Sequence, residues 1–503
     1  MKRILYNSIT FIVFFLLLPF LPLIYLFSSK RRANMLERLG CIHLISKKHS
    51  KSNSQPYPDS RSYPELNPHK KRIWLHALSV GEVKSALPLV NAIKEKYLSN
   101  SDCELVITAS TKTGFDVAHQ LFLTHLEKNN QSNSYAMSVQ VGYFPFDFYF
   151  SVKSICSRIS PDLVIIVESD LWPQFLWYMN DKKIPVFLVN ARLSQSSFNG
   201  YMALRKMGLF SSIFSLFEKI MVQTEIDKER FLQIGVPEAK TIVAGNIKFD
   251  QPIPKTDIPD LDKFKNYHQL NNHIQEINNY TQELNNHNPR YIVAGSTHEG
   301  EEEVLVSVFV ELKQRIKLKQ NSRINSFSCS DCSCNNYSDI KFIIAPRDPK
   351  RAADIKKMLN TKGFESIFLS EISINNKSNI EIDIIIIDKM GILSALYSIC
   401  DIAFVGGSLV QSGGHNPLEP AIFSKPVVFG TYTDDFKEIT ETMLSNDAAF
   451  RVKDKNELFE TIFMLLNDKE LASRVGQNGY NLVINGRGAI DRVLSVISQN
   501  DSK

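Results

Sequence analysis

Three residues could take part in acid–base or ionic chemistry: the carboxylates Glu82 and Glu168 and the cation Lys248. Glu82 follows an apolar run within the segment Ser-Val-Gly-Glu, where a strand-to-helix turn would let a substrate hydroxyl approach its carboxylate. A carboxylate near a helix N-terminus is stabilised as the anion, so partial desolvation must restore its basicity. We interpret Glu82 as a general base, with ordinary helix capping as the alternative role.

The segment between residues 405 and 430 has the composition of a phosphate-binding turn. Two Gly pairs are followed by Asn416 and Pro417, which suit the N-cap and the first position of a helix. The N–H groups at the start of such a helix would bind an anion without a dedicated lysine. Glu419 stands where a capping-box acid stands, so capping of its own helix is its alternative role.

Two cations are suited to complete such a site. Arg347 follows the apolar run Lys-Phe-Ile-Ile-Ala-Pro, and its guanidinium could form two parallel hydrogen bonds to a phosphate; a surface ion pair is the alternative. Lys248 lies at the junction of the two halves of the chain. The P-loop, G-x-G-x-x-G, H-E-x-x-H and G-x-S-x-G motifs do not occur in their expected settings, which leaves group transfer from an activated nucleotide.

The elements that must position these residues are strands alternating with helices. This alternation, first within 72–245 and again after residue 290, predicts an α/β protein with two doubly wound parallel sheets. Ligands bind beyond the carboxyl ends of such strands, so the polar and glycine residues found there are candidates to line an interdomain cleft. They are Ser79, Gly81, Arg192, Ser296, Thr297, Gly407, Ser408 and Gly414.

Shifts in composition divide the chain into four regions. We predict a membrane anchor at 1–32, a linker and mobile loop at 33–71, an N-terminal domain at 72–245 and a C-terminal domain at 246–503. The C-terminal domain contains two low-complexity insertions, 263–289 and 320–339.

The N-terminal segment is a candidate membrane anchor. Residues 4–29 carry no charge and are long enough to cross about 30 Å of hydrocarbon as a helix. Pro19 and Pro22 would kink that helix, so an in-plane or hairpin insertion stays open, and a cleaved signal peptide is a further alternative. More basic residues follow the apolar run than precede it, which predicts that the body lies on the cytoplasmic face.

Charge and cysteine content exclude other classes. The 503 residues have a formal net charge of +5 without a concentrated basic stripe, which argues against a nucleic-acid-binding protein. Seven cysteines are too few for a disulfide framework and favour a reducing compartment. Cys329, Cys332 and Cys334 cluster in an insertion that we interpret as an exposed loop, with structural zinc as the alternative. His76, inside an apolar run, is interpreted as a packed histidine.

Seven segments resemble, in order, the motifs of bacterial 3-deoxy-D-manno-octulosonic acid (Kdo) transferases: LHALSVGEVKSALPLV, VESDLWPQ, VNARLS followed by GY, GNIKFD, AGSTHEGEEE, APRDPKR and GGSLVQSGGHNPLEP. The resemblance implies a GT-B glycosyltransferase, with two Rossmann-like domains facing a cleft, that moves Kdo from CMP-Kdo to a lipid A precursor in lipopolysaccharide synthesis. It also implies an enzyme attached to the inner (cytoplasmic) membrane beside its lipid acceptor.

The resemblance assigns roles to single residues. Glu82 matches the general base of an inverting mechanism, and Glu168 and Lys248 match residues that support the transition state. The positions that match CMP contacts are Pro346, Arg347, Gly391, Ile392, Leu393, Asn416, Pro417, Leu418 and Glu419. Lys248, Arg347 and the helix start at Asn416 would stabilise the charge on the departing phosphate, so we predict neither a metal nor a cofactor.

The chain departs from the family pattern at a few positions. Asp348 and Lys350 replace the His and Glu of an Arg-His-Pro-Glu-Arg run, and Ile392 replaces a common acidic residue. Ser169 and Asp170 replace Thr and Glu. A GT-B transferase that uses a UDP-sugar and a non-enzymatic membrane adaptor remain the alternative functions. The number of Kdo units transferred and the oligomeric state are not predicted.

Overall fold

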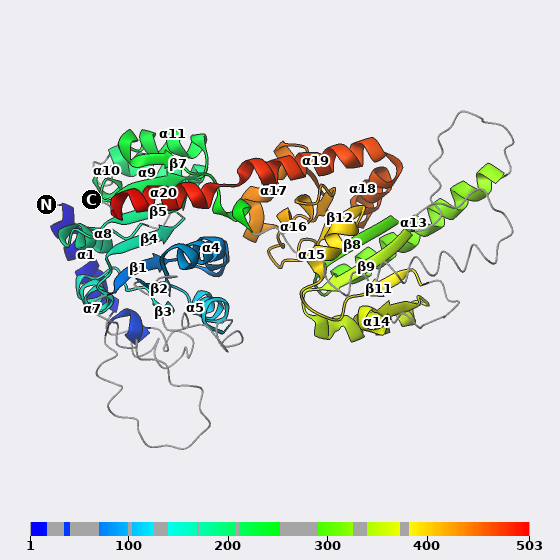
Figure 1. Ribbon diagram of the computed structural model, residues 1–503, viewed down its shortest axis with the longest axis horizontal. Coiled ribbons are helices and arrows are strands. Elements are labelled where there is room, and N and C mark those ends of the chain that lie inside the picture. Colours follow the sequence, from blue (N-terminus) through cyan, green and yellow to red (C-terminus); the bar gives the residue numbers. More distant parts are fainter. Residues whose placement is uncertain are drawn as a thin grey trace, which may run out of the picture. The chain divides into compact units, whose positions relative to one another are not determined.

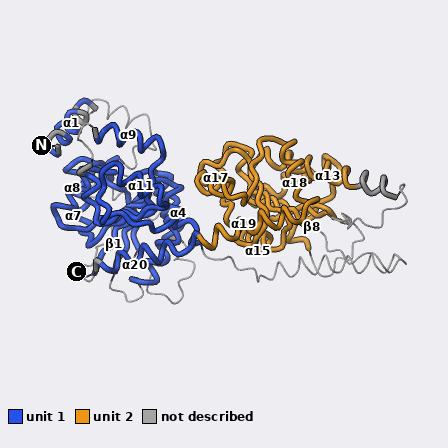
Figure 2. Tube along the Cα trace, turned by 90° about the horizontal axis from the view of Figure 1, so that it is seen from above, with its two compact units in different colours: residues 1–251, 486–503 blue, residues 252–485 orange. Residues whose placement is uncertain are grey.

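The computed structural model of the protein describes residues 2–17, 35–40, 70–98, 103–124, 139–168, 171–206, 211–251, 290–324, 340–372 and 382–501. The chain divides into two compact units (Figure 2). The first unit contains Met1–Gln251 and Gly486–Lys503, and the second contains Pro252–Asn485. Each unit is built around its own parallel sheet.

The sheet of the first unit has seven parallel strands in the order β3-β2-β1-β4-β5-β6-β7. The winding therefore reverses between β1 and β4, which pair directly with each other (Figure 1). The strands are β1 Lys71–His76, β2 Cys103–Ala109, β3 Val139–Tyr143, β4 Leu163–Val167, β5 Val186–Ala191, β6 Lys219–Val222 and β7 Thr241–Val243.

Alternate residues of these strands enter two different cores, because successive side chains of a strand point to opposite faces. In β1, Ile73 and Leu75 pack with α4, α5 and α20, whereas Trp74 packs with α7, α8 and α11. Burial of both faces explains the nearly continuous apolar runs. The helices and helical turns of this unit are α1 Lys2–Leu17, α4 Val80–Ile93, η3 Lys94–Leu98, α5 Lys112–His119, η4 Gln120–Thr124, α7 Tyr149–Ile159, α8 Pro173–Asp181, α9 Gln195–Lys206, α10 Ser211–Phe214, α11 Glu225–Gln233, η6 Glu238–Lys240, η7 Ile247–Asp250 and α20 Ala489–Asp501.

The second unit repeats this plan with seven parallel strands in the order β10-β11-β9-β8-β12-β13-β14. The winding reverses here between β8 and β12, which also pair directly. The strands are β8 Arg290–Thr297, β9 Ile340–Pro346, β10 Ser366–Phe368, β11 Ile384–Ile386, β12 Ile402–Val405, β13 Val427–Phe429 and β14 Ala449–Arg451.

The second sheet is also covered on both faces. In β8, Ile292 and Ala294 pack with α13, α14 and α18, while Val293 packs with α15. The helices and helical turns of this unit are α13 Glu301–Ile324, η8 Pro349–Arg351, α14 Ala352–Thr361, η9 Leu369–Glu371, α15 Leu393–Ile399, α16 Leu418–Ala421, η10 Asp434–Phe436, α17 Lys437–Ser445, α18 Lys455–Asn467 and α19 Lys469–Gly486.

Two doubly wound parallel sheets confirm the predicted α/β architecture and match the two Rossmann-like domains of a GT-B fold. The sequence analysis missed the strands at the four edges of the sheets, namely β3, β7, β10 and β14. Each of them contains half-buried residues that interrupt its apolar run, whereas β11 and β13, which also have three residues, are fully buried and were predicted.

The last helix, α20, belongs to the first unit, although the sequence analysis assigns all of 246–503 to the second domain. Helix α20 lies in the first unit (Figure 1), and its Val493 and Ile497 are buried in the same core as residues of β1 and α4. The apolar stripe of this helix is readable in the sequence, but the sheet that it covers is decided by the path of the chain.

Hydrogen bonds join the start of α20 to residues 244–250, near the end of the segment Met1–Gln251. The Asp250 carboxylate accepts the N–H groups of Gly488 and Ile490, each at 2.6 Å. Arg492 donates from Nε to the carbonyl oxygen of Ala244 at 2.7 Å. These contacts cap the helix and fasten it beside η7.

Helix α1 contacts the first unit through two polar side chains. The Tyr6 hydroxyl donates to Asp147 at 2.7 Å, and Arg3 pairs with Asp181 at 2.6 Å. Within the described ranges, no helix is both long and apolar enough to cross a bilayer. Residues 18–32 of the predicted anchor lie outside those ranges, so the anchor stays a prediction.

Part of the predicted linker packs on the first unit. The Arg38 guanidinium donates to the carbonyl oxygens of Phe144 at 3.0 Å and Ser110 at 3.1 Å, and the Gly40 carbonyl accepts the Ser154 hydroxyl at 3.0 Å. The prediction of a mobile loop is therefore wrong for residues 35–40. Other predictions fall outside the described residues: most of the linker, 263–289, nearly all of 320–339 with its three cysteines, Ser169 and Asp170.

Candidate active site

Glu82 and Glu168 lie at the carboxyl ends of the two strands between which the first sheet reverses its winding. β1 leads into α4, whose first turn contains Glu82, and Glu168 directly follows β4. The two strands are paired in parallel, with His76 opposite Ile166. In doubly wound sheets, the crevice at this reversal point is where ligands bind. The topology therefore brings both predicted acidic residues to the ligand-binding edge of one sheet.

The Glu82 carboxylate helps to cap the start of α4 by binding the main chain of Leu78, the residue before the N-cap Ser79. Its Oε2 accepts the N–H of Leu78 at 2.5 Å, and its own N–H donates to the Ser79 hydroxyl at 3.5 Å. Its Oε1 accepts a longer hydrogen bond, from Ser79 Oγ at 3.3 Å. The predicted alternative, helix capping, is thus present. It does not exclude a base, because an ionised carboxylate has more lone-pair positions than these bonds use.

Glu168 and Lys248 form an ion pair. Glu168 Oε1 and Lys248 Nζ are 3.5 Å apart, and the lysine and glutamate side chains are 12% and 19% exposed. Glu168 has a φ of +66°, a left-handed conformation that is uncommon for a residue with a Cβ. Its N–H donates to the Val189 carbonyl at 2.8 Å, which holds this strained residue in place. The structure therefore joins two residues that are 80 positions apart in the sequence.

Three amide side chains, whose hydrogen bonds the sequence analysis did not predict, connect Lys248 to the sheet. They are Asn190, Gln223 and Asn246, which stand at the carboxyl ends of β5, β6 and β7. Asn246 Oδ1 accepts the N–H of Lys248, Asn246 Nδ2 donates to Gln223 Oε1, and Gln223 Nε2 donates to the Asn190 carbonyl, each at 3.0 Å. Their place after consecutive strands is the signal that could have identified them.

The other candidates of the first unit have simpler surroundings. Ser79 is the N-cap of α4, Gly81 lies in the first turn of that helix, and Arg192 is half-buried after β5. His76 is fully buried and stacks on Phe144 with ring centroids 3.8 Å apart. Burial lowers the pKa of His76 to about 3, so it stays neutral and fills the core, as predicted.

The corresponding edge of the second sheet is closed by a carboxylate of the chain itself. Glu301 is fully buried and accepts four backbone N–H groups. Its Oε2 accepts those of His298 at 2.9 Å and Gly407 at 2.7 Å, and its Oε1 accepts those of Ser408 and Leu409 at 2.9 Å. Gly407 and Ser408 are predicted cleft residues, but their amides are already bonded. Glu301 takes the place that an external anion would take at such a turn.

Three further candidates at this edge hold the loop together. Thr297 is fully buried and donates to Glu302 at 3.0 Å. Gly414 donates its N–H to the Gly407 carbonyl at 2.8 Å. Ser296 has a φ of +56°. Its carbonyl oxygen packs so close to Gly406 that a Cβ added to that glycine would lie only 2.5 Å from it. These contacts give Thr297, Gly414 and Ser296 structural roles in this loop.

Arg347, Asn416 and Glu419 lie near one another in the second unit. The Asn416 side chain hydrogen-bonds the Glu419 carboxylate, and the Arg347 charge acts on the same carboxylate. Burial raises the pKa of Glu419 above its ordinary value, while these two neighbours lower it. The Arg347 side chain is exposed. Sequence-distant residues thus place a cation suited to phosphate beside a carboxylate and an amide suited to hydroxyl groups.

The helix after Asn416 is only one turn long, and its N-cap is Pro417 rather than the predicted Asn416. α16 has four residues, and Asn416 Oδ1 accepts the N–H of Leu418 at 3.1 Å. The helix dipole arises from aligned peptide units, so one turn of helix contributes little. The prediction that this helix start binds phosphate is therefore not supported, and Arg347 is the group suited to that task.

The remaining nucleotide candidates offer main-chain rather than side-chain groups. Pro346 and Pro417 are buried, as are Leu418 and Ile392, and Ile392 lies in the core beneath α15. Gly391 is exposed with a φ of +89°, a conformation that favours glycine. The Ile392 side chain thus occupies the core where the family pattern has an acidic residue. Leu393 packs beside Gly295.

The sequence analysis did not predict the pairing of two histidines beside this segment. The Nε2 atoms of His298 and His415 are 2.8 Å apart, and the rings stack with centroids 5.1 Å apart. One ring must donate and the other accept, so the accepting ring is neutral. Each histidine lies within a quoted motif, which is the signal that could have selected them. Among the described residues, no group of three or more His, Cys, Asp and Glu side chains is placed to hold a metal ion.

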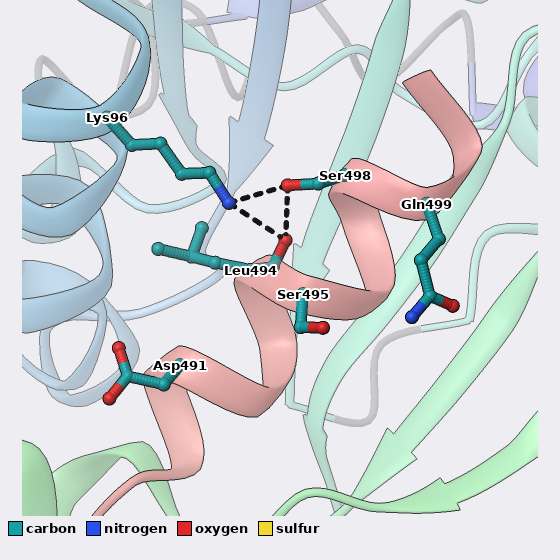
Figure 3. A pocket seen from close by; sticks show the side chains of 6 residues that line it. All are labelled: Lys96, Asp491, Leu494, Ser495, Ser498 and Gln499. Atoms are coloured by element: carbon teal, nitrogen blue, oxygen red, sulfur yellow. Dashed lines mark hydrogen bonds between the residues drawn. The ribbon is translucent and has the colours of Figure 1, made fainter. Parts of the chain in front are cut away.

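A hollow of about 490 Å³ lies between α20 and η3, and its lining side chains are shown in Figure 3. Lys96 crosses it and donates to the Ser498 hydroxyl at 2.6 Å. Lys96 follows the C-terminal end of α4, whereas Glu82 lies in the first turn. At 1.5 Å per residue, roughly 20 Å of helix separates them, so this hollow is distant from the predicted base.

Comparison with known proteins agrees with the motifs. A family model described as "3-Deoxy-D-manno-octulosonic-acid transferase (kdotransferase)" matches residues 34–251. The 3-deoxy-D-manno-octulosonic acid transferase of Haemophilus influenzae is 28% identical over 498 residues, which cover 99% of this chain and 98% of that protein. A bifunctional glycosyltransferase/methyltransferase of Fusobacterium nucleatum is 32% identical over 82% of this chain, which spans 55% of that longer protein.

Among solved structures, the C-terminal CMP-Kdo binding domain of WaaA from Acinetobacter baumannii is similar to 44% of this chain, with 98% of that domain covered, 21% identity and a TM-score of 0.33. The family model and the full-length relative cover the segments in which Glu82, Glu168 and Lys248 lie. Residues 34–251 therefore match the model of the 3-deoxy-D-manno-octulosonic acid (Kdo) transferase family, and the chain is similar over its whole length to a transferase of this kind.

Proposed function

We propose that the protein is an inverting transferase that moves Kdo from CMP-Kdo to a lipid A precursor in lipopolysaccharide core synthesis. The observation that carries this proposal is the grouping of Glu82 with the Glu168–Lys248 ion pair at the reversal point of the first sheet. A base needs a fixed orientation, which the Leu78 N–H supports, and the reversal point of a doubly wound sheet is where ligands bind.

In the proposed reaction, Glu82 accepts the proton of the attacking hydroxyl. A sugar hydroxyl of the acceptor forms a bond to the anomeric carbon of Kdo, and the bond from that carbon to the phosphate oxygen breaks with its electron pair leaving on CMP. The proton passes to the Glu82 carboxylate, whose orientation is supported by the Leu78 N–H at 2.5 Å.

Cations stabilise the charge that develops on the departing phosphate. The ammonium of Lys248 is mostly buried and held by Glu168, so its charge is weakly screened by water. Arg347 is exposed in the second unit and is suited to hold the phosphate by two parallel hydrogen bonds. In this proposal the two side chains replace a metal ion.

Asn416 and Glu419 are proposed to hold the nucleotide by its hydroxyl groups. Their mutual hydrogen bond fixes the carboxylate, and burial around it strengthens any bond that it accepts. The main chain of Gly391 and Leu393 supplies further contacts in this proposal.

The acceptor is a membrane lipid, and we propose that the N-terminal segment attaches the enzyme to the inner membrane, with its body on the cytoplasmic face. Phe11, Ile12 and Leu16 of α1 support this, since their side chains are 61%, 56% and 65% exposed. Apolar groups left in water on one helix favour contact with a lipid surface.

The proposal is tested by mass analysis of lipid product. Purified protein is incubated with a lipid A precursor and either CMP-Kdo or UDP-sugars. We expect product with CMP-Kdo, with a mass that also counts the Kdo units added. Product with a UDP-sugar instead, or no product from well-folded protein, would contradict the proposal.

Two substitutions separate the base from the cap. Glu82→Gln keeps an oxygen that accepts the Leu78 N–H, whereas Glu82→Ala removes it. We expect kcat to fall by about 10²–10⁴-fold in both variants, because neither can accept the proton. The Ala variant should also lose about 1 kcal/mol of stability, measured by urea unfolding. Glu82→Gln with wild-type turnover would remove Glu82 from the reaction.

A further inference from the structure

Lys248 reaches Glu168 from the far side of the sheet. The lysine follows β7 and the glutamate follows β4, and β5 and β6 lie between these strands. Adjacent strands are about 4.8 Å apart, so β4 and β7 are separated by about 14 Å. The four-carbon stem of a lysine spans roughly half of that distance. The main chain after β7 must therefore turn back across the sheet edge before the ion pair can form.

The Asn190 side chain holds this returning turn. Asn190 Oδ1 accepts the N–H of Ile247 at 3.1 Å, and Ile247 is the first residue of η7, directly before Lys248. Asn190 is fully buried, as is Ile247. This bond fixes η7 above the end of β5, the neighbour of β4, and so brings the lysine within reach of Glu168.

The backbone of β5 is shaped to present this side chain. Asn190 lies at an irregularity in the pairing of β5 with β6, between Val189 and Ala191, and has a φ of +59°. Asparagine tolerates this left-handed conformation better than most residues, and an extra residue in a strand re-aims a side chain. The unfavourable backbone conformation at Asn190 therefore directs its side-chain amide toward η7.

A second connection leads through Gln223 and Asn246. Gln223 joins the Asn190 carbonyl to the Asn246 side chain, which accepts the N–H of Lys248. The main chain of η7 is thus held at Ile247 and at Lys248, and both connections begin at Asn190. Removal of the Asn190 side chain breaks the first and leaves the second.

We infer that Asn190 is a positioning residue that acts through Lys248: it holds η7 so that the ammonium stays paired with Glu168 and directed at the departing phosphate. This inference rests on the proposed function for its effect on turnover. Its structural content, the placement of the lysine, can be measured without activity.

The first experiment measures the placement of Lys248 by the rate at which its amine is acylated, read by peptide mass spectrometry in the full-length protein. Asn190→Gly keeps the left-handed backbone and deletes the amide, while Asn190→Asp keeps an acceptor for the Ile247 N–H. We expect labelling about 2- to 10-fold faster in the Gly variant, the shift that loss of one net hydrogen bond produces, and little change in the Asp variant. Unchanged labelling in Asn190→Gly would overturn the inference.

The second experiment measures turnover in a double-mutant cycle. Asn190→Gly should lower kcat about 10- to 100-fold with the KM for CMP-Kdo unchanged, and should add no loss in a Lys248→Ala background. Equal losses in both backgrounds would overturn the inference, because Asn190 would then act independently of Lys248. Wild-type turnover in Lys248→Ala would instead contradict the proposed role of the lysine, and the labelling result would still decide its placement.

Lys183→Gly serves as the matched control. Lys183 is exposed in the same unit and has a φ of +58°, nearly the same as that of Asn190. Glycine at this position should alter neither the labelling of Lys248 nor turnover. A change equal to that in Asn190→Gly would show that the effect comes from backbone flexibility, which would also overturn the inference.

Discussion

The carboxylates of this protein divide into those that serve the fold and those that remain suited to chemistry. Glu301 accepts four backbone N–H groups in the interior of the second unit, which makes it an internal anion that closes the turn after β12. Glu82 also caps a helix, but its half-buried carboxylate has one oxygen held by a long bond. At the residue scale, the complete burial of Glu301 among main-chain donors marks it as a structural residue.

Glu419 is a residue whose pKa makes a prediction. Burial raises its pKa above the ordinary 4.5, so ionisation costs more in the folded chain than in the unfolded one. The stability contributed by the protonated carboxyl is complete below pH 4.5 and is lost as the pH rises through the folded value. We therefore expect Glu419→Gln to raise the melting temperature at pH 8 and to leave it unchanged near pH 4.

The same substitution should weaken CMP binding about tenfold, because a neutral amide accepts weaker hydrogen bonds than a carboxylate. Melting curves at the two pH values and calorimetric titration with CMP check both effects. Glu365→Gln, which changes an exposed glutamate of the same unit, is the control and should alter neither quantity. A lower melting temperature at pH 8 in Glu419→Gln would contradict the predicted direction.

At the scale of elements, α20 packs into the core of the first unit, although most of that unit lies far earlier in the sequence. Val493 and Ile497 are buried with residues of β1 and α4, which lie about 400 positions earlier in the chain. Asp250 caps the start of this helix from the end of η7. Because η7 also contains Lys248, the attachment of the last helix and the position of the lysine depend on the same short turn.

Ile497→Ala should therefore destabilise the first unit. The side chain is 1% exposed, and removal of a buried isoleucine side chain typically costs about 2–5 kcal/mol through lost burial and the cavity left behind. We expect earlier exposure of first-unit peptides in hydrogen exchange, with second-unit peptides unchanged. Ser495→Ala, on the exposed side of α20, should have little effect. Selective loss of protection in the second unit would contradict the assignment of this helix.

For the whole molecule, one architecture is used twice for different tasks. Each unit has a seven-stranded parallel sheet with one reversal point. In the first unit, that point carries two acidic residues and a lysine suited to proton transfer and charge stabilisation. In the second unit, the same point is sealed by Glu301, and the exposed cation Arg347 follows the neighbouring strand β9. In the proposed function, the first unit therefore supplies the catalytic residues and the second unit binds the nucleotide.

This division predicts that nucleotide affinity and turnover respond to different substitutions. Arg347→Ala should weaken CMP binding by roughly 10- to 150-fold, the equivalent of a hydrogen bond to a charged group worth about 1.5–3 kcal/mol. Glu82→Gln should leave CMP affinity unchanged while turnover falls. Isothermal titration with CMP measures both, and Lys350→Ala, an exposed cation nearby, is the control. Equal loss of affinity in Arg347→Ala and Lys350→Ala would indicate a general effect of surface charge.

Local patterns in the sequence were sufficient for the central strands and for the fold class. Strands such as β1, β4, β8 and β12 are buried on both faces, so their apolar runs are continuous and easily read. The edge strands β3, β7, β10 and β14 were missed because half-buried residues interrupt their apolar patterns, whereas the equally short β11 and β13 are fully buried. The Glu82, Glu168 and Lys248 positions were also readable, from strand ends and from the resemblance of their motifs.

Tertiary structure alone decided how these residues are connected. Three features join segments that are distant in the chain. They are the pairing of Glu168 with Lys248, the hydrogen bond of Gln223 to Asn190, and the attachment of α20 to the first unit. Sequence patterns report the environment of each segment through its burial and periodicity. They carry no information on which buried acceptor meets which amide, because that depends on strand order and on the path of the chain between strands.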